Sequence, residues 1–285
     1  MSPFIRLLGV AIGLLLPLFP LHAQEEKPLT LGFMPYLSSA SLLEKYTPLV
    51  RYLGEQLGRP VHIKIARNYQ EHIEQIGENK LDIAFLGGSP YVAVTDHYGK
   101  KPLLVRYAFD GTPYFRAVIV VSNNSPITSL DQLAGKRMAF GNINSTLSSQ
   151  VPLYMIMQKG VRLAQLATYK HLRNHENVLL GVAFGEFDAG AVAEEVYRES
   201  MGLDLHLLAT SPLLSTHLFV TRSDMPAALQ ARIRQLLMQL HTTEQGLGVL
   251  QSINRKLTAF VSVKDSDYDL HRTILREVLP VLQQP

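Results

Sequence analysis

Between residues 29 and 221 the chain alternates short strand-like segments with helix-like segments, and this order limits its possible folds more than any other feature. Apolar residues alternate with other residues over 29–33 and 61–65, whereas they recur at helical spacing over 42–57. The segment 82–88, DIAFLGG, is mostly apolar, as expected for a strand that is covered on both faces. Strands that alternate with helices predict a parallel or mixed α/β sheet.

The strand–helix cycle restarts near residue 125, which predicts two lobes. Extended segments near 116–121 and 216–221 would cross between the lobes as a two-strand hinge. We therefore expect a first part of lobe 1 over 24–117, lobe 2 over 118–216, and a return to lobe 1 with C-terminal helices over 217–285. Those helices are expected near 226–242, 244–254 and 267–279, and an earlier helix is expected over 146–159.

The first 23 residues have the three-part pattern of a secretory signal peptide: a positive start, an apolar run over 7–19, and a small residue, Ala23, before the cut. The apolar run is too short to cross a bilayer, and no later run has membrane length. The chain has no cysteine, which excludes disulfides, thiolate chemistry and a lipid-modified N-terminal cysteine. We expect a free periplasmic protein, and its nearly balanced charge (27 Lys+Arg, 24 Asp+Glu) argues against nucleic acid as a partner.

Two polar turns follow predicted strands and begin predicted helices. One is GNINSTLSSQVP, residues 141–152, with four hydroxyls and two amides within residues 142–149, and the other contains Ser89-Pro90. A helix N-terminus carries unpaired N–H groups, and neighbouring hydroxyls add donors, so such a turn can hold an anion. A plain helix cap explains each turn equally well. Because ligands of open α/β sheets bind beyond the carboxyl ends of strands, both turns should face one cleft.

Beyond these patterns, the chain resembles a known protein family over nearly all of residues 31–268. The resemblance is carried by ordered segments: Leu31-Gly32-Phe33-Met34-Pro35-Tyr36, residues 46–53, residues 81–91, residues 129–137, Asn144-Ser145-Thr146, His175-Glu176-Asn177-Val178, residues 187–191 and Asp265-Ser266-Asp267-Tyr268. The family comprises the phosphate-, phosphite- and phosphonate-binding proteins of bacterial ABC importers. The resemblance implies a two-lobed periplasmic binding protein that captures a small oxyanion for a membrane permease and its ATPase.

The resemblance also implies a site. Family members hold the phosphonate group on a Ser-Thr-Ser-Gly turn, which Ser145 and Thr146 match, whereas Leu147 and Ser148 depart from it. Ser148 or Ser149 would have to replace the missing hydroxyl. The expected ligand contacts are Ser145, Thr146, Ser148, Tyr36, Ser89, Tyr91, Tyr114, His175, Glu194 and His217. Of the adjacent Glu194 and Glu195, one is expected to line the cleft and the other to be solvated.

His217 is a second departure from the family. Members that take an aminoalkyl phosphonate have an acidic residue near this point, and an imidazole does not hold an ammonium group. Aminoethylphosphonate is therefore not the expected ligand. Each tyrosine of the set could equally pack in the core, and His175 could cap the helix that follows it.

The rival function is a periplasmic oxyanion sensor that feeds a membrane histidine kinase, although the lack of cysteine disfavours arsenite. No nucleophile motif or phosphate-binding Gly-Lys-Ser/Thr loop is present, so we expect no enzyme activity. His171 and His175 have a spacing that suits a metal on a helix, but a break is expected between them, and no metal or cofactor is expected. We expect a monomer.

Overall fold

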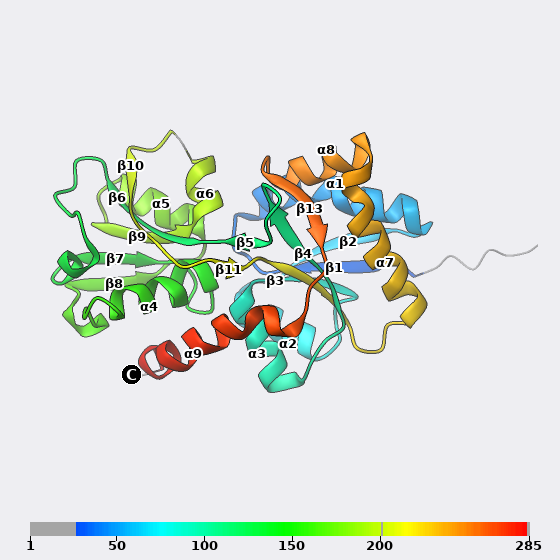
Figure 1. Ribbon diagram of the computed structural model, residues 1–285, viewed down its shortest axis with the longest axis horizontal. Coiled ribbons are helices and arrows are strands. Elements are labelled where there is room, and N and C mark those ends of the chain that lie inside the picture. The colour runs from blue at the N-terminus through cyan, green and yellow to red at the C-terminus, as the bar shows by residue number, and fades with distance from the viewer. Residues whose placement is uncertain (1–26, 201, 284–285) are drawn as a thin grey trace, which may run out of the picture.

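The computed structural model describes residues 27–200 and 202–283, so the expected signal peptide lies outside the described residues. The described chain forms two lobes, each built on a mixed sheet (Figure 1). Among the described residues, no helix is both long and apolar enough to span a membrane. The expected two-lobed α/β architecture is thus present.

Lobe 1 is built on the six-stranded sheet, whose order is β13-β4-β12-β3-β1-β2. Its strands are β1 (Leu29–Phe33), β2 (Val61–Ile65), β3 (Ile83–Leu86), β4 (Leu103–Phe109), β12 (Leu218–Thr221) and β13 (Leu257–Val261). β1 pairs in parallel with β2 and β3, whereas β12 is antiparallel to β3 and β4. All four residues of β3 are buried, as expected for a strand covered on both faces.

The helices of lobe 1 begin and end where local chemistry predicts. They are α1 (Ser39–Leu57), α2 (Tyr69–Gly77), α3 (Gly88–Tyr98), α7 (Ala227–Gln239) and α8 (Glu244–Ile253). The Ser38 side chain caps α1 by accepting from the Ser41 N–H, and Gly58 ends it with φ 66°. β13 lies in a region where only helices were expected, and it pairs at the sheet edge with β4.

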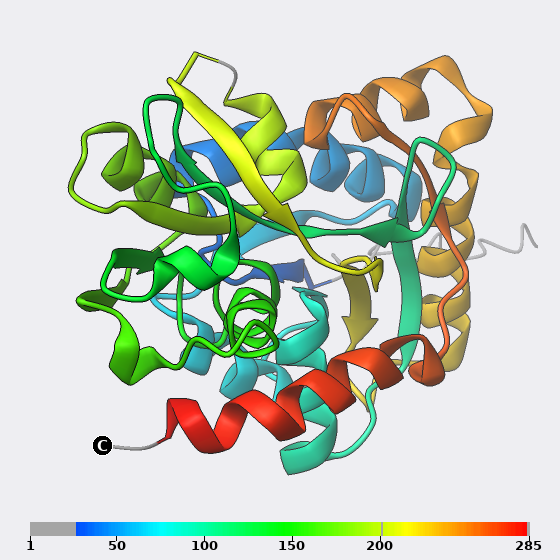
Figure 2. The ribbon, with the colours of Figure 1, turned by 60° about the vertical axis from the view of Figure 1, so that its left-hand side comes forward.

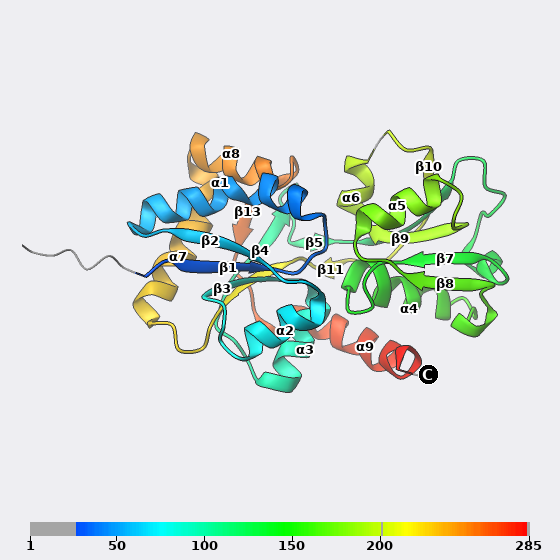
Figure 3. The same ribbon diagram turned by 180° about the vertical axis from the view of Figure 1, so that it is seen from behind.

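Lobe 2 is built on the five-stranded sheet, whose order is β10-β6-β9-β7-β8. The strands are β6 (Ala117–Ser122), β7 (Arg137–Phe140), β8 (Thr168–His171), β9 (Ala189–Ala193) and β10 (Leu205–Thr210), and the helices are α4 (Val151–Met157), α5 (His175–Ala183) and α6 (Glu194–Glu199). Figure 3 shows the two sheets from behind, side by side with their helices around them. The chain passes between the lobes through β5 (Tyr114–Phe115) and β11 (Leu214–Ser215), which pair with each other.

The last helix, α9 (Asp269–Leu282), crosses from one lobe to the other. It packs against α3 of lobe 1 and α4 of lobe 2 (Figure 2). The Gln158 side-chain amide donates to Glu277 of α9 at 3.0 Å. The C-terminal helix is therefore a third connection between the lobes, in addition to β5 and β11.

The helix that was expected over 146–159 is divided in two. Residues 146–150 form a π-helical turn, and α4 begins at Val151. Pro152 has no N–H, so the Ser148 carbonyl cannot accept the usual helical bond from it. That carbonyl accepts instead from the Gly141 N–H at 2.7 Å. The proline thereby frees a carbonyl that ties the polar turn back to the end of β7.

Candidate functional site

The two polar turns meet between the lobes. The backbone N–H of Ser89, in the first turn of α3, donates to the Thr146 Oγ1 hydroxyl at 2.8 Å, and both residues are buried. No side chain caps α3, because Gly87 occupies its cap position. A hydroxyl of lobe 2 thus satisfies a free helix N–H of lobe 1, and both groups are suited to an anion.

Within the second turn the hydroxyls serve different purposes. Ser145 Oγ accepts from the Ser148 N–H at 3.3 Å and from Ser148 Oγ at 2.8 Å, so it caps the turn as expected. Ser149 Oγ lies 3.4 Å from His171 Nδ1 and points to the sheet side. Neither Ser148 nor Ser149 lines the space between the lobes, whereas Leu147 does. The position of the family's third hydroxyl is therefore an apolar wall here.

A small cavity of about 10 Å³, which we call the anion chamber, lies at this meeting point. Its lining residues come from both lobes: Met34, Tyr36, Tyr69, Gly87, Pro90, Ser145, Thr146, Leu147, His175 and His217. The volume corresponds to about one water molecule, so the lobes must separate before any larger ligand can bind. The structure is a closed conformation of the two lobes.

The anion chamber brings together five of the ten expected contact residues: Tyr36, Ser145, Thr146, His175 and His217. Ser89 contributes its backbone N–H at the chamber's edge. Tyr69 of α2 also lines the anion chamber. It was not among the expected contacts, because its position in the sequence indicates only the buried face of a helix.

The other four expected residues do not line the anion chamber. The Tyr91 hydroxyl donates to Asp265 at 2.8 Å, and the half-exposed Tyr114 ring lies beneath Arg106. Ser148 is bonded to Ser145, as described above. Glu194, the first residue of α6, accepts from Arg198 Nε one helical turn later, at 2.9 Å, and lines a different cavity near the hinge.

The two histidines of the chamber are held in the neutral form. Burial lowers the pKa of His175 to about 4, and burial together with the nearby His175 and His271 lowers the pKa of His217 to about 3. His175 Nδ1 accepts from the Ala193 N–H at 3.1 Å. The proton of the neutral His175 ring is therefore on Nε2, which makes that nitrogen a hydrogen-bond donor.

A second small cavity, of about 20 Å³, lies on the far side of Tyr36 and His217, and we call it the acidic chamber. Its lining includes Lys45, Tyr46, Tyr107, Glu195 and Glu199. The hydroxyls of Tyr36, Tyr46 and Tyr107 form a chain with steps of 2.9 and 3.0 Å. Burial raises the pKa of Glu195 to about 8. Glu195, rather than its neighbour Glu194, is thus the carboxyl that turns inward.

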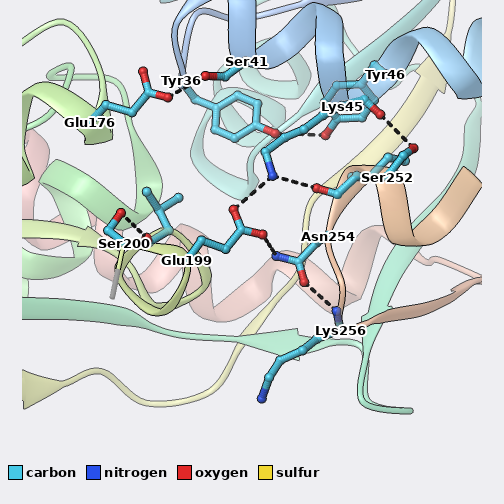
Figure 4. Close-up of polar contacts among 12 residues, drawn as sticks. Tyr36, Ser41, Lys45, Tyr46, Glu176, Glu199, Ser200, Ser252, Asn254 and Lys256 are labelled. Carbon is cyan, nitrogen blue, oxygen red and sulfur yellow. Dashed lines mark hydrogen bonds and ion pairs between the residues drawn. The ribbon is translucent and has the colours of Figure 1, made fainter. Parts of the chain in front are cut away.

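Two glutamates of lobe 2 bind lobe 1 beside these chambers, and we call them the acidic clasp (Figure 4). Glu176 accepts from the Ser38 N–H at 2.9 Å and from Ser41 Oγ at 2.7 Å, at the N-terminus of α1. Glu199 pairs with Lys45 Nζ at 2.9 Å and accepts from Asn254 Nδ2 at 2.7 Å. The acidic clasp stabilises the closed conformation.

A larger cavity, of about 800 Å³, lies between α2, α3 and α9, and its lining also includes Ser89, Pro90 and, from the second polar turn, Asn144 and Gln150. It contains neither the Thr146 hydroxyl nor a chamber histidine, so its size does not make it the anion site. Among the described residues there is no group of three or more potential metal ligands.

The chain has relatives among known proteins. Residues 31–268 match the profile of a family described as "ABC transporter, phosphonate, periplasmic substrate-binding protein". The chain is 28% identical over 249 residues to the phosphonates-binding periplasmic protein of Escherichia coli K12, covering 83% of this chain and 73% of that one. It is 25% identical over 183 residues to the phosphate-import protein PhnD of Mycolicibacterium smegmatis, covering 61% and 57%.

A solved structure has the same fold. PhnD1 from Prochlorococcus marinus MIT 9301, in complex with methylphosphonate, superimposes with a TM-score of 0.81 at 21% identity and covers 89% of this chain and 98% of that chain. A binding-protein component of a phosphonate ABC transporter from Pseudomonas aeruginosa superimposes with a TM-score of 0.78 at 19% identity, covering 87% of this chain and 85% of that chain.

Proposed function

Because the chain belongs to the family of periplasmic substrate-binding proteins of phosphonate ABC transporters, we propose that its anion chamber binds a small phosphorus oxyanion and that the protein presents this ligand to a membrane permease and its ATPase. The candidate ligands are phosphite, phosphate and methylphosphonate, because each is a small oxyanion. The family is one of substrate-binding proteins, not of enzymes.

One observation carries the proposal: the bond between the Ser89 N–H and Thr146 Oγ1 joins the two polar turns across the cleft. When the lobes separate, the Ser89 N–H, the Thr146 hydroxyl and the start of the π-helical turn become free to bind an oxyanion. Lobe closure would then place the anion where this bond now lies. The His175 Nε2–H is a further donor in the chamber wall.

The chamber is electrostatically suited to an anion but not to a cation. Its wall holds donors and neutral imidazoles, and none of the described residues that line it is a carboxylate. A phosphonate group with one or two negative charges gains charge-assisted hydrogen bonds there, each worth roughly 1.5–3 kcal/mol. An ammonium group would find no counter-charge, and this supports the expectation that aminoethylphosphonate is not the preferred ligand.

The location and assembly of the protein follow from the same proposal. Residues 1–23 would be removed as a signal peptide, and the remaining chain would act as a free periplasmic monomer. The proposal includes no lipid anchor, because the sequence has no cysteine to carry one.

A thermal-shift panel on purified residues 24–285 tests the function. The ligands are phosphate, phosphite, hypophosphite, methylphosphonate, aminoethylphosphonate, sulfate and arsenate. A ligand at 100 times its dissociation constant adds about 2.7 kcal/mol to the free energy of unfolding. We expect a clear shift with at least one small phosphorus anion and its loss in Thr146→Ala. If none of these anions shifts the melting temperature, the proposed function is wrong.

A further inference from the structure

The cavity of about 800 Å³ between α2, α3 and α9, which we call the outer pocket, has the volume of a pocket for a small organic molecule. Its wall comes from both lobes: α2 and α3 belong to lobe 1, whereas Asn144 and Gln150 belong to the second polar turn of lobe 2. The helix α9, which packs against both lobes, supplies the third side (Figure 2). The complete outer pocket therefore exists only in the closed conformation.

One part of the wall is apolar. Three helices contribute to it: Ile73 from α2, Val92 from α3, and Leu275 and Leu279 from α9. Such side chains bind the hydrocarbon part of a ligand, because its apolar surface is thereby removed from water. A purely ionic ligand such as phosphate gains nothing from this wall. The outer pocket thus favours a ligand with an organic body.

Another part of the wall carries positive charge. Arg272 and Arg276 lie one helical turn apart on α9, and both line the outer pocket. Arg272 is already paired with Asp265 and, at 2.8 Å, with Asp269. Arg276 forms no ion pair with any described residue, and Asp96 is the one carboxylate among the described residues of the lining. Arg276 is therefore available to a negative group of a ligand.

A buried acceptor adds a third feature. Gln150 lines the outer pocket but is only 3% exposed, and its Oε1 accepts no hydrogen bond from the described residues. A buried acceptor without a partner costs free energy, and native structures contain few of them. A ligand that brings an N–H or O–H group into the pocket supplies the missing donor.

We infer that the outer pocket is a second ligand site, which takes an organic anion with an apolar body, one carboxylate or sulfonate group and a hydrogen-bond donor. The negative group pairs with Arg276, the apolar body lies against the leucines of α9, and the donor bonds to Gln150. This ligand is distinct from the oxyanion of the anion chamber, because Pro90 alone of the described residues lines both cavities.

The two sites are linked through the start of α3. Pro90 follows directly after Ser89, whose N–H is bonded to Thr146. The His271 ring of α9 packs so closely on Gly88 that a Cβ there would lie 2.1 Å from it. Because both ligands favour the closed conformation, each should raise the affinity for the other. This coupling, unlike the site itself, rests on the proposed function.

Fluorescence titration with 8-anilinonaphthalene-1-sulfonate tests the site, because this probe combines aromatic rings with a sulfonate and an N–H group. Its neutral counterpart, N-phenyl-1-naphthylamine, lacks only the sulfonate. The wild type should bind the sulfonate probe at one saturable site. Arg276→Gln should weaken the sulfonate probe by about three- to fivefold, the size of one partly exposed ion pair, and leave the neutral probe unchanged. Ala93→Trp fills the pocket from α3 and should weaken both probes by at least ~10-fold.

Two control variants locate the probe. Arg232→Gln removes an exposed arginine of α7, and Phe184→Ser removes the most exposed large apolar side chain of the described residues. Neither should change the binding of either probe. Absence of saturable binding to the wild type, an equal effect of Arg276→Gln on both probes, unchanged binding in folded Ala93→Trp, or loss of binding in Phe184→Ser would each overturn the inference. Arg276 is exposed, so its variant keeps the test decisive even if Ala93→Trp does not fold.

The coupling is tested by repeating the titration with saturating phosphite, phosphate or methylphosphonate, whose own binding is measured by calorimetry. The sulfonate probe should then bind about fivefold more tightly or better. An unchanged probe affinity with bound oxyanion would refute the coupling, and weaker binding would place the sulfonate in the anion chamber and overturn the inference. Failure of the proposed function looks different, because no oxyanion would then bind, whereas the probe would still bind the outer pocket.

Discussion

Replacement of Glu176 by alanine should shift the balance between closed and open lobes. The change removes two hydrogen bonds that cross the cleft, from the Ser38 N–H at 2.9 Å and from Ser41 Oγ at 2.7 Å. Each is charge-assisted and lies at a helix N-terminus, but water reaches the partly exposed carboxylate. We therefore expect a loss of about 2 kcal/mol from the closed conformation, less than two full charge-assisted bonds would give.

An energy of ~2 kcal/mol changes the ratio of closed to open molecules by about 30-fold. The experiment that detects this change depends on whether the lobes of the unliganded wild type are mostly closed or mostly open. If its lobes are mostly closed, the variant becomes more open, and small-angle X-ray scattering should show a larger radius of gyration without ligand. If they are mostly open, the same energy appears as weaker binding, because a ligand must then supply the closure.

The matched control is Glu71→Ala. Glu71 also accepts a backbone N–H near a helix N-terminus, that of Arg67 at 2.7 Å, but both residues belong to lobe 1. Glu71→Ala should therefore change neither the radius of gyration nor the affinity. Glu176→Ala is measured by scattering and by calorimetry with phosphite. If it changes neither the radius of gyration nor the affinity, the reasoning about the acidic clasp is refuted.

Two further predictions concern stability. Gly141→Ala would place a Cβ 1.9 Å from Ser148 Oγ, so we expect a loss of about 1–3 kcal/mol in urea unfolding, and an unchanged midpoint would contradict the close packing of the turn. The second concerns pH: burial lowers the pKa of His72 and His175 to about 4, and of His217 and His271 to about 3. Below pH ~6.5 the unfolded chain binds protons at these four histidines that the folded chain does not, so stability should fall from pH 6.5 toward pH 4. The raised pKa of Glu195 acts in the opposite direction below pH ~8, but it is one group against four. Urea unfolding at pH 7, 6 and 5 checks this, and a midpoint that does not fall would refute it.

Local patterns were sufficient to predict both polar turns and most strands of the two sheets, but not β13. The buried strand at 83–86 and the Ser145 cap are properties of short segments, and the order of the segments brought both turns to one cleft. The π-helical turn was not predicted in detail, because it depends on the carbonyl of Ser148 finding the Gly141 N–H seven residues earlier.

Side-chain direction was the main limit on predicting the site. Glu194 and Glu195 are adjacent, and only the position of α6 against lobe 1 decides which carboxyl turns inward. Tyr91 is buried beside the first polar turn, yet its hydroxyl binds Asp265, 174 residues later. Contacts over such separations leave no periodic pattern in the sequence.

The bond between the Ser89 N–H and Thr146 Oγ1 makes ligand capture an exchange reaction when the closed states with and without ligand are compared. The incoming group must replace an acceptor that belongs to the protein, so the net free energy is the difference between the new bonds and the lost one. A neutral solute offers bonds of about the same strength as the hydroxyl and gains little. A charged oxyanion accepts bonds roughly twice as strong and gains at every donor. The internal bond therefore acts as a threshold that favours charged ligands over neutral ones.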